Sequence, residues 1–272
     1  MAPANWKHLS LPLALLLGAC ATPGNSGPGA QSPGAQAAWL ARARVIDLGH
    51  PFTPDMPVYP GGTPLDAKVL GTVEKDGYFI RQFVMGEHVG THVDAPAHFA
   101  PGMATVDRLP PEALVGPAAV VDVTAQVAQN PDYEVSPADI EAWERANGPL
   151  QSQHLVLIRT GWASRWPDEK RYRNADAAGV MHFPGLSVAA SQLLRQRQVR
   201  AVGIDTLSTD PGPSTTFAQH KDFLSAGGYQ IENLADLSML PAVGAFLVVS
   251  PLPVKDGSGA PARVFAFLPP EG

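Results

Sequence analysis

Apolar residues recur along this chain in short runs that are typical of buried β-strands. The runs are five to eight residues long, are rich in Val, Ile, Leu and Ala, and are separated by turn residues such as Gly, Pro and Asp. Runs of this kind predict β-strands. We expect strands at residues 44–48, 78–85, 118–123, 154–159, 201–205, 245–249 and 263–268.

Three segments carry helix signals. The segment 136–146 begins with Ser-Pro-Ala-Asp, a start similar to a capping box with proline at the first helical position, and it ends before Asn147-Gly148. A second helix is expected over 188–198, and a third over 217–226, where Gly227-Gly228 would end it. Strands mixed with helices predict the α/β fold class.

The amino-terminal segment differs from the rest of the chain. An apolar run at 9–17 follows Lys7, and it is too short to span a bilayer but suits a signal-peptide core. The run leads into Leu-Gly-Ala-Cys, which resembles the bacterial lipoprotein box, where lipid is attached to the cysteine. We predict a lipoprotein signal peptide at 1–19, a lipidated Cys20 with a flexible Gly/Pro/Ser linker at 20–43, and one folded domain at 44–272.

The lipoprotein resemblance implies export to the periplasm and a lipid anchor at Cys20. The residue after the cysteine is Ala21, not the aspartate that would retain a lipoprotein in the inner membrane. We therefore expect the protein to be anchored in the outer membrane and to contact the membrane only through its lipid. Cys20 is the only cysteine, which excludes a disulfide within the chain. The net charge is −6, and the sequence has no stripe of basic residues that could neutralise phosphates. We therefore expect a small-molecule substrate and no nucleic-acid partner.

The run from His88 to His98 reads His-Val-Gly-Thr-His-Val-Asp-Ala-Pro-Ala-His, and it holds three of the eight histidines. Imidazole and carboxylate groups are the usual ligands of zinc and similar metals. On a straight strand, at roughly 3.3 Å per residue, His88 would lie about 20 Å from Asp94, too far to share a metal. The chain must therefore turn, and Gly90 is the natural place because glycine tolerates positive φ. After the turn His92 and Asp94 can project together, with His98 on a loop beside them.

Two later residues are candidates for the same site. His220 falls in the third expected helix, and Glu232 lies between Ile231 and Leu234. A carboxylate in such apolar surroundings is either exposed on a surface strand or buried with a partner. A metal would be such a partner, because a lone buried carboxylate is costly.

The run at 88–98 matches the signature His-x-Gly-Thr-His-x-Asp-x-Pro-x-His of the metal-dependent cyclase family, which the chain resembles over roughly 44–268. Bacterial kynurenine formamidases, isatin hydrolases and related amide hydrolases belong to this family. The likeness continues in short motifs at 47–50, 58–61, 159–162, 183–186, 203–206 and 232–234. The resemblance implies a compact mixed-sheet domain of the swivelling β/β/α type, assembled as a homodimer or homotetramer.

The resemblance also implies roles for particular residues. It places divalent-metal ligands at His88, His92, Asp94, His220 and Glu232. Asp94 would bridge two ions, although some members use one ion, or manganese instead of zinc. His98 would be the proton donor and acceptor. Tyr59 would contact substrate, near the place where the formamidases have a tryptophan.

A metal of this kind lowers the pKa of a bound water towards about 7 and so supplies hydroxide. Covalent serine catalysis is not expected, because the chain has no Gly-x-Ser-x-Gly motif. We therefore predict a metal-dependent hydrolase of an amide C–N bond in a small aryl formamide or cyclic amide. The alternatives are a polyketide-type cyclase or dehydratase on the same metal site, and a metal-binding lipoprotein without turnover.

Other side chains are expected to be structural. The aromatic residues Phe79, Phe83, Trp162 and Phe183 are expected mainly in the core. Asp205 and Asp210 flank a Thr/Ser-rich loop and are expected to be structural loop residues.

Overall fold

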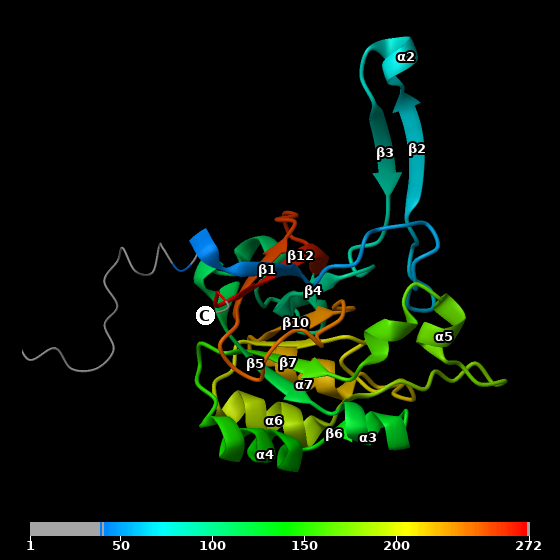
Figure 1. Ribbon diagram of the computed structural model, residues 1–272. Helices are drawn as coiled ribbons and strands as arrows, with labels where there is room; N and C mark the ends of the chain where they lie inside the picture. The colour runs from blue at the N-terminus through cyan, green and yellow to red at the C-terminus, as the bar shows by residue number, and fades with distance from the viewer. Residues whose placement is uncertain (1–38, 40, 271–272) are drawn as a thin grey trace, which may run out of the picture. The chain divides into compact units, whose positions relative to one another are not determined.

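The computed structural model describes Trp39 and residues 41–270, which contain both strands and helices (Figure 1). The predicted signal peptide, Cys20 and most of the linker lie outside the described residues, so they stay predictions. Among the residues described, no helix is both long enough and apolar enough to cross a bilayer.

The described strands and helices follow the predicted apolar runs closely, and each predicted strand or helix segment contains an element of that type. The strands are β1 (Arg44–Asp47), β2 (Asp66–Gly71), β3 (Ile80–Val84), β4 (His92–Asp94), β5 (Val115–Asp122), β6 (Glu134–Val135), β7 (Leu155–Arg159), β8 (Gly185–Leu186), β9 (Ala201–Ile204), β10 (Tyr229–Glu232), β11 (Phe246–Pro251) and β12 (Gly259–Leu268). The helices are α2 (Val73–Asp76), α3 (Thr124–Gln129), α4 (Pro137–Asn147), α5 (Glu169–Arg173), α6 (Val188–Gln196) and α7 (Ala218–Ser225).

The main sheet closes on itself. Within the described residues its strand order is β1-β12-β11-β5-β7-β9-β10-β4, and β12 also pairs with β4. The ring therefore consists of seven strands from β12 round to β4, with β1 added beside the carboxyl half of β12. β5, β7, β9 and β10 are parallel, and helices connect them as parallel strands require.

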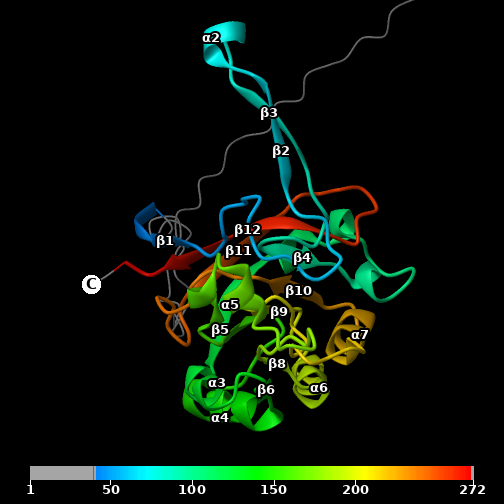
Figure 2. The same cartoon turned by 90° about the vertical axis from the view of Figure 1, so that its right-hand side faces the viewer.

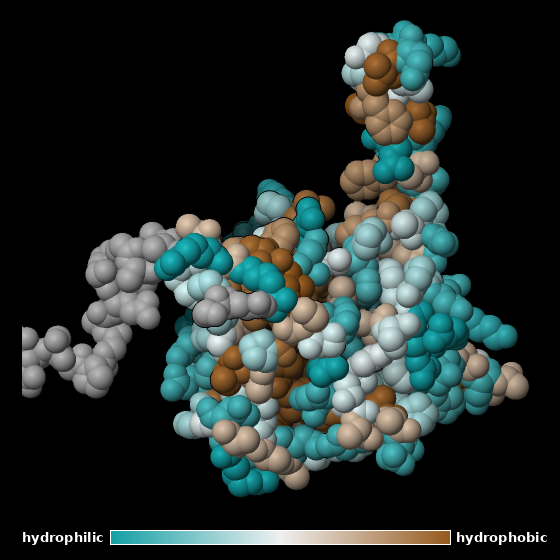
Figure 3. Space-filling view, viewed as in Figure 1, coloured by the Kyte–Doolittle hydropathy of each residue, from teal (hydrophilic) through white to brown (hydrophobic). Residues whose placement is uncertain are grey.

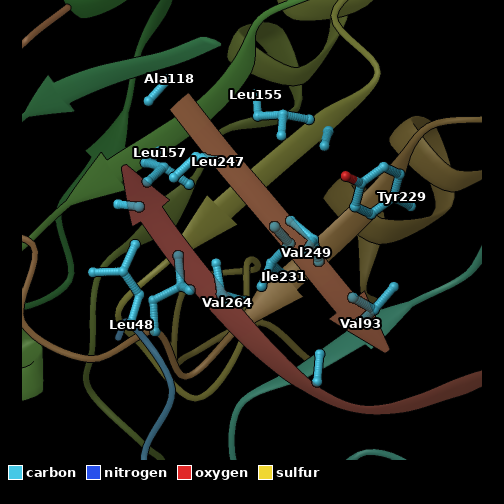
Figure 4. Packing of buried hydrophobic residues seen from close by; sticks show 14 of the residues in the cluster. Leu48, Val93, Ala118, Leu155, Leu157, Tyr229, Ile231, Leu247, Val249 and Val264 are labelled. Atoms are coloured by element: carbon cyan, nitrogen blue, oxygen red, sulfur yellow. The ribbon is translucent and has the colours of Figure 1, made fainter. Parts of the chain in front are cut away.

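Side chains of the parallel strands alternate between two cores. Leu155 and Leu157 of β7 join the apolar cluster inside the ring, with Val249 and Val264 from the opposite side (Figure 4). Val156 and its neighbour Ile158 instead join the cluster beneath the helices. This two-sided burial explains why these strands read as continuous apolar runs.

The helices cover the outer face of the parallel strands. Figures 1 and 2 both show α3, α4 and α6 together on one side of the sheet. α4 begins with the predicted capping box, in which Ser136 and Asp139 satisfy each other's backbone N–H groups. The predicted α/β class with a compact mixed sheet is confirmed.

The expectation for two of the aromatic side chains is wrong. Trp162 and Phe183 are buried as expected, whereas Phe79 and Phe83 are exposed on the β2–β3 hairpin. Their pattern is that of a strand, but within the described residues no second layer covers this hairpin.

Leu157→Ala tests the inner core. Leu157 is fully buried on the central strand β7, so its truncation should lower the free energy of unfolding by about 2–5 kcal/mol. Chemical denaturation measures this change. The matched control is Leu252→Ala, at a half-exposed leucine, which should change the free energy by less than about 0.5 kcal/mol. Equal effects of the two substitutions would contradict the core assignment.

Candidate metal centre

The polar residues of β4 and β10 share the outer face of the ring. β10 pairs with β4 in the antiparallel register that sets Glu232 opposite His92 and Gln230 opposite Asp94. Directly opposed residues lie on one face of a sheet. The alternate residue Val93 points into the apolar core instead. Strand geometry therefore brings His92, Asp94 and Glu232 together.

The turn before β4 is held by hydrogen bonds from side chains to backbone carbonyls. Gly90 has a φ of +59°, as the sequence predicted for the turn, and a Cβ there would lie 2.3 Å from the ring of Phe52. The Thr91 hydroxyl donates to the Asn233 carbonyl at 2.6 Å, and the Asn233 amide donates to the Gly90 carbonyl at 2.9 Å. These bonds tie the turn to the end of β10.

His88 reaches the site because glycine leaves space for it. Gly259 of β12 pairs with Asp94, and a Cβ on Gly259 would lie 2.4 Å from Cε1 of His88. The imidazole of His88 occupies that space, with its Nδ1 2.5 Å from Oδ1 of Asp94. This glycine, 171 positions from His88, has no signal in the local sequence.

His220 approaches from the other side, on the first turn of α7. Its Nε2 lies 3.2 Å from Oδ2 of Asp94 and 3.0 Å from Oε1 of Glu232. Its backbone N–H and that of Gln219 both donate to the Asp210 carboxylate at 3.1 Å. Asp210 thus fixes the start of this helix next to β4.

The side chains form two groups that share Asp94. Among the described residues, ligand atoms within 4.8 Å of one another occur in the group His88, His92 and Asp94 and in the group Asp94, His220 and Glu232. Oδ1 of Asp94 faces the first group and Oδ2 faces His220. Glu232 also spans both groups, because its Oε2 lies 3.5 Å from Nε2 of His92.

Each histidine of the two groups has its outer nitrogen engaged. Nδ1 of His92 donates to the Gly90 carbonyl at 2.9 Å, and Nδ1 of His220 donates to the Asp210 carboxylate at 2.6 Å. Nε2 of His88 donates at 2.9 Å to the hydroxyl of Ser258, which itself donates to a glutamate. With the outer nitrogens held in this way, the inner nitrogen of each imidazole faces Asp94, where it would offer its lone pair to a metal once it has lost its proton.

The electrostatics of the site favour a cation. Burial disfavours the charged imidazolium, yet the Asp94 carboxylate raises the pKa of His92 to about 9. Burial likewise opposes the charge on His220, but hydrogen bonds to Asp210 and Asp94 raise its pKa well above the usual value. The buried carboxylates of Asp94, Asp210 and Glu232 thus create a field that attracts positive charge.

This donor set fits a divalent metal. Imidazole nitrogens and carboxylate oxygens are ligands that zinc and manganese accept, and second partners orient the histidines here as they do in metal sites. The five residues that the sequence nominated as ligands are therefore brought together, in an arrangement that can hold one or two ions. Their roles as ligands are part of the proposal below.

A cavity of about 260 Å³ opens onto the two groups. The rings of Tyr59, Phe99 and Phe217 line it together with His98. The His98 ring stacks on His88 with the centroids 3.8 Å apart. Burial lowers the pKa of His98 to about 4, so its imidazole is neutral beside the cation-attracting groups.

Several contributing residues were not singled out from the sequence as parts of the site. Phe99 and Phe217 line the cavity, and Ser258 orients His88. Asp210 was expected to be a structural loop residue, but it is buried and holds the ring of His220 as well as capping its helix. Phe99 follows the histidine run directly, whereas Ser258 and Asp210 become relevant only through the fold.

Asp210→Asn tests how His220 is held. The amide keeps an oxygen for the helix N–H groups but removes the negative charge beside Nδ1 of His220. We expect metal affinity to fall by about 10–100-fold, as for other outer partners of ligating histidines. Competition with a chelator of known affinity measures this change.

The control for that substitution is Asp236→Asn, which removes the same charge outside the cavity lining. The Asp236 carboxylate accepts hydrogen bonds from Ser238 in its own loop. Asp236→Asn should leave metal affinity unchanged. Equal affinities of Asp210→Asn and the wild-type chain would show that Asp210 does not orient a ligand.

Comparison with known proteins agrees with this geometry. The family model described as "Putative cyclase" matches residues 46–211. The isatin hydrolase of Roseibium aggregatum is 30% identical over 255 residues, covering 90% of this chain and 97% of that protein. The kynurenine formamidase of Bacillus cereus is 28% identical, covering 80% of this chain and 94% of that protein.

A solved structure shows the same fold. Isatin hydrolase A from Ralstonia solanacearum superposes with a TM-score of 0.81 at 33% sequence identity, covering 89% of this chain and 99% of that chain. The structural similarity therefore covers most of the chain. The chain belongs to the cyclase family.

Proposed function

We propose that this protein is a metal-dependent hydrolase that cleaves the amide C–N bond of a small aryl formamide or cyclic amide. One observation carries the proposal. The two carboxylate oxygens of Asp94 face two different histidine-containing groups, and a cavity opens onto both groups. The similarity to an isatin hydrolase and to kynurenine formamidases supports hydrolysis of a C–N bond.

His88, His92, Asp94, His220 and Glu232 would hold the metal, and we propose zinc as the ion, with manganese as the alternative. When bound, a divalent metal lowers the pKa of a water and polarises a carbonyl. The protein's own contribution is a set of imidazoles whose orientation is fixed before substrate arrives.

The cavity suits a small planar substrate. Its volume of about 260 Å³ lies below the roughly 300–1,000 Å³ typical of sites for larger ligands. Tyr59 and Phe217 form a tilted aromatic pair with centroids 5.8 Å apart, and Phe99 and Phe217 form another at 5.4 Å. These rings would pack against the aromatic part of the substrate, with its amide towards Asp94.

His98 would move the proton. Because its imidazole is neutral, it can accept a proton from the attacking water and deliver that proton to the leaving nitrogen. Its stacking on His88 holds the ring at the edge of the site. The new bond joins the water oxygen to the carbonyl carbon, and the C–N bond breaks as the nitrogen receives the proton.

His98→Ala tests this assignment. It should lower kcat by about 10²–10⁴-fold while leaving metal content unchanged, because the proton path is lost and the proposed ligands remain. Steady-state kinetics and elemental analysis measure the two quantities. His154→Ala, at a histidine outside the cavity lining, is the matched control and should retain wild-type kcat. Wild-type turnover by His98→Ala would remove His98 from the mechanism.

Metal removal tests the reaction class. The chain stripped by a chelator should lose hydrolysis of an aryl formamide or an isatin-like lactam, and zinc or manganese should restore it. In ¹⁸O-water, mass spectrometry should find one solvent oxygen in the product acid. Full activity without metal would contradict the proposal, and a product without solvent oxygen would indicate a cyclase or dehydratase instead.

A further inference from the structure

Polar and apolar side chains are not simply sorted by depth in this molecule. Figure 3 shows apolar side chains exposed along the β2–β3 hairpin. Behind the metal centre, by contrast, three uncharged polar side chains are completely buried, namely those of Thr209, Gln219 and Gln230. A buried hydroxyl or amide costs free energy unless it is hydrogen-bonded, so such a group calls for an explanation.

The three side chains form one chain of hydrogen bonds. The hydroxyl of Thr209 donates to Oε1 of Gln230 at 3.0 Å. Nε2 of Gln230 in turn donates to Oε1 of Gln219 at 2.8 Å. The three residues lie in the loop after β9, on β10 and on α7, so the chain connects three segments that surround the ligand group of His220 and Glu232.

Thr209 contacts two proposed ligands of that group. Its backbone N–H donates to Oε1 of Glu232 at 2.8 Å, and its hydroxyl oxygen lies 3.3 Å from Nδ1 of His220. The same Oε1 of Glu232 lies 3.0 Å from Nε2 of His220. A single residue therefore holds the glutamate through its main chain and the histidine through its side chain.

The direction of these hydrogen bonds determines what His220 can do. A threonine hydroxyl has one proton, and here it is donated to the amide oxygen of Gln230. Only the lone pairs of the hydroxyl then face Nδ1 of His220, so this contact requires an N–H on the histidine. The Asp210 carboxylate, 2.6 Å from Nδ1, requires the same. The proton is thereby kept on Nδ1, which leaves Nε2 as the nitrogen that can bind a metal.

Gln219 fixes the orientation of the Gln230 amide. If that amide were reversed, its NH₂ would face Thr209, and the threonine hydroxyl would turn its proton towards Nδ1 of His220. The carbonyl of the Gln219 side chain prevents this, because it accepts from Nε2 of Gln230. Nε2 of Gln219 itself is buried with no hydrogen-bond partner in the described part of the chain. A network that is kept although its last donor is unpaired indicates a functional role, since an apolar core would be more stable.

We propose that Thr209 is a positioning residue of the metal centre, which orients Glu232 through its backbone N–H and His220 through its hydroxyl. Gln230 and Gln219 set the direction of that hydroxyl. The inference rests on the proposed function, because it takes the histidine and the glutamate as metal ligands. It adds that an uncharged network behind these ligands, together with the carboxylate of Asp210, determines how tightly they bind a metal.

The test compares Thr209→Val and Thr209→Ser in the full-length chain. Valine has nearly the shape of threonine and keeps the backbone N–H to Glu232, but it lacks the hydroxyl. Competition with a chelator should find the zinc dissociation constant of Thr209→Val raised about 10-fold, the lower end of the range for outer partners of ligating histidines. Thr209→Ser keeps the hydroxyl and should retain wild-type affinity. The absorption spectrum of the cobalt-loaded protein, which reports coordination geometry, should change only in Thr209→Val.

Gln219→Met tests the far end of the network. It removes the amide that orients Gln230 without altering Thr209, so it should weaken zinc binding in the same direction. The matched control is Thr160→Val, the same change at a buried threonine whose hydroxyl donates to Asp205 at 2.7 Å. It should keep wild-type zinc affinity. Far-UV circular dichroism should be unchanged in all four variants.

Unchanged zinc affinity in Thr209→Val and Gln219→Met would overturn this proposal and leave the proposed function intact. A loss that Thr209→Ser or Thr160→Val shares would also overturn it, because the effect would then come from packing or stability. A wild-type chain that binds neither zinc nor manganese would instead overturn the proposed function itself.

Discussion

The structure around the site depends on one buried carboxylate. Asp94 is 1% exposed, and a charge buried this deeply is costly unless positive charge or several donors surround it. Its two oxygens face histidines from two parts of the chain, the turn before β4 and the start of α7. Both segments therefore supply partners that offset the cost of burying this charge.

The closed sheet gives that carboxylate a rigid position. β4 has only three residues, but it pairs with β10 on one side and β12 on the other. Its middle residue Val93 is fixed in the inner core, which forces His92 and Asp94 outward. A site on a strand that is paired on both edges is held more precisely than one on a loop.

The orientation of each histidine is set by a different kind of partner. A backbone carbonyl holds His92, a serine hydroxyl holds His88, and the carboxylate of Asp210 holds His220. A carboxylate partner makes an imidazole a stronger donor than a neutral partner does. The two halves of the site are therefore not equivalent, because the half around His220 concentrates more negative charge. Glu232, within the second group, and Asp210, outside it, both contribute to this asymmetry.

The amino-acid sequence by itself determined the local features. Leu155–Ile158 is apolar at every position, because both of its faces are buried, and this pattern predicts a strand from a few neighbouring residues. The turn at Gly90 follows from the reach of an extended chain, and it places His92 and Asp94 together within a single segment. The eleven-residue run was therefore enough to nominate a metal site.

Only the tertiary structure decided which distant residues complete the site and which apolar residues are left uncovered. β4 is short and polar, so no periodicity predicts it, and its strand form depends on pairing with β10 and β12. The histidines are also positioned by Asp210, Ser258 and Gly259. Some of these contacts join residues as many as 171 positions apart along the chain. Phe83 has the residue type of a core position, but burial also requires a second layer, which the described chain does not supply. The local pattern of residues determines which secondary structure a segment can form, whereas long-range packing determines which residues each side chain contacts.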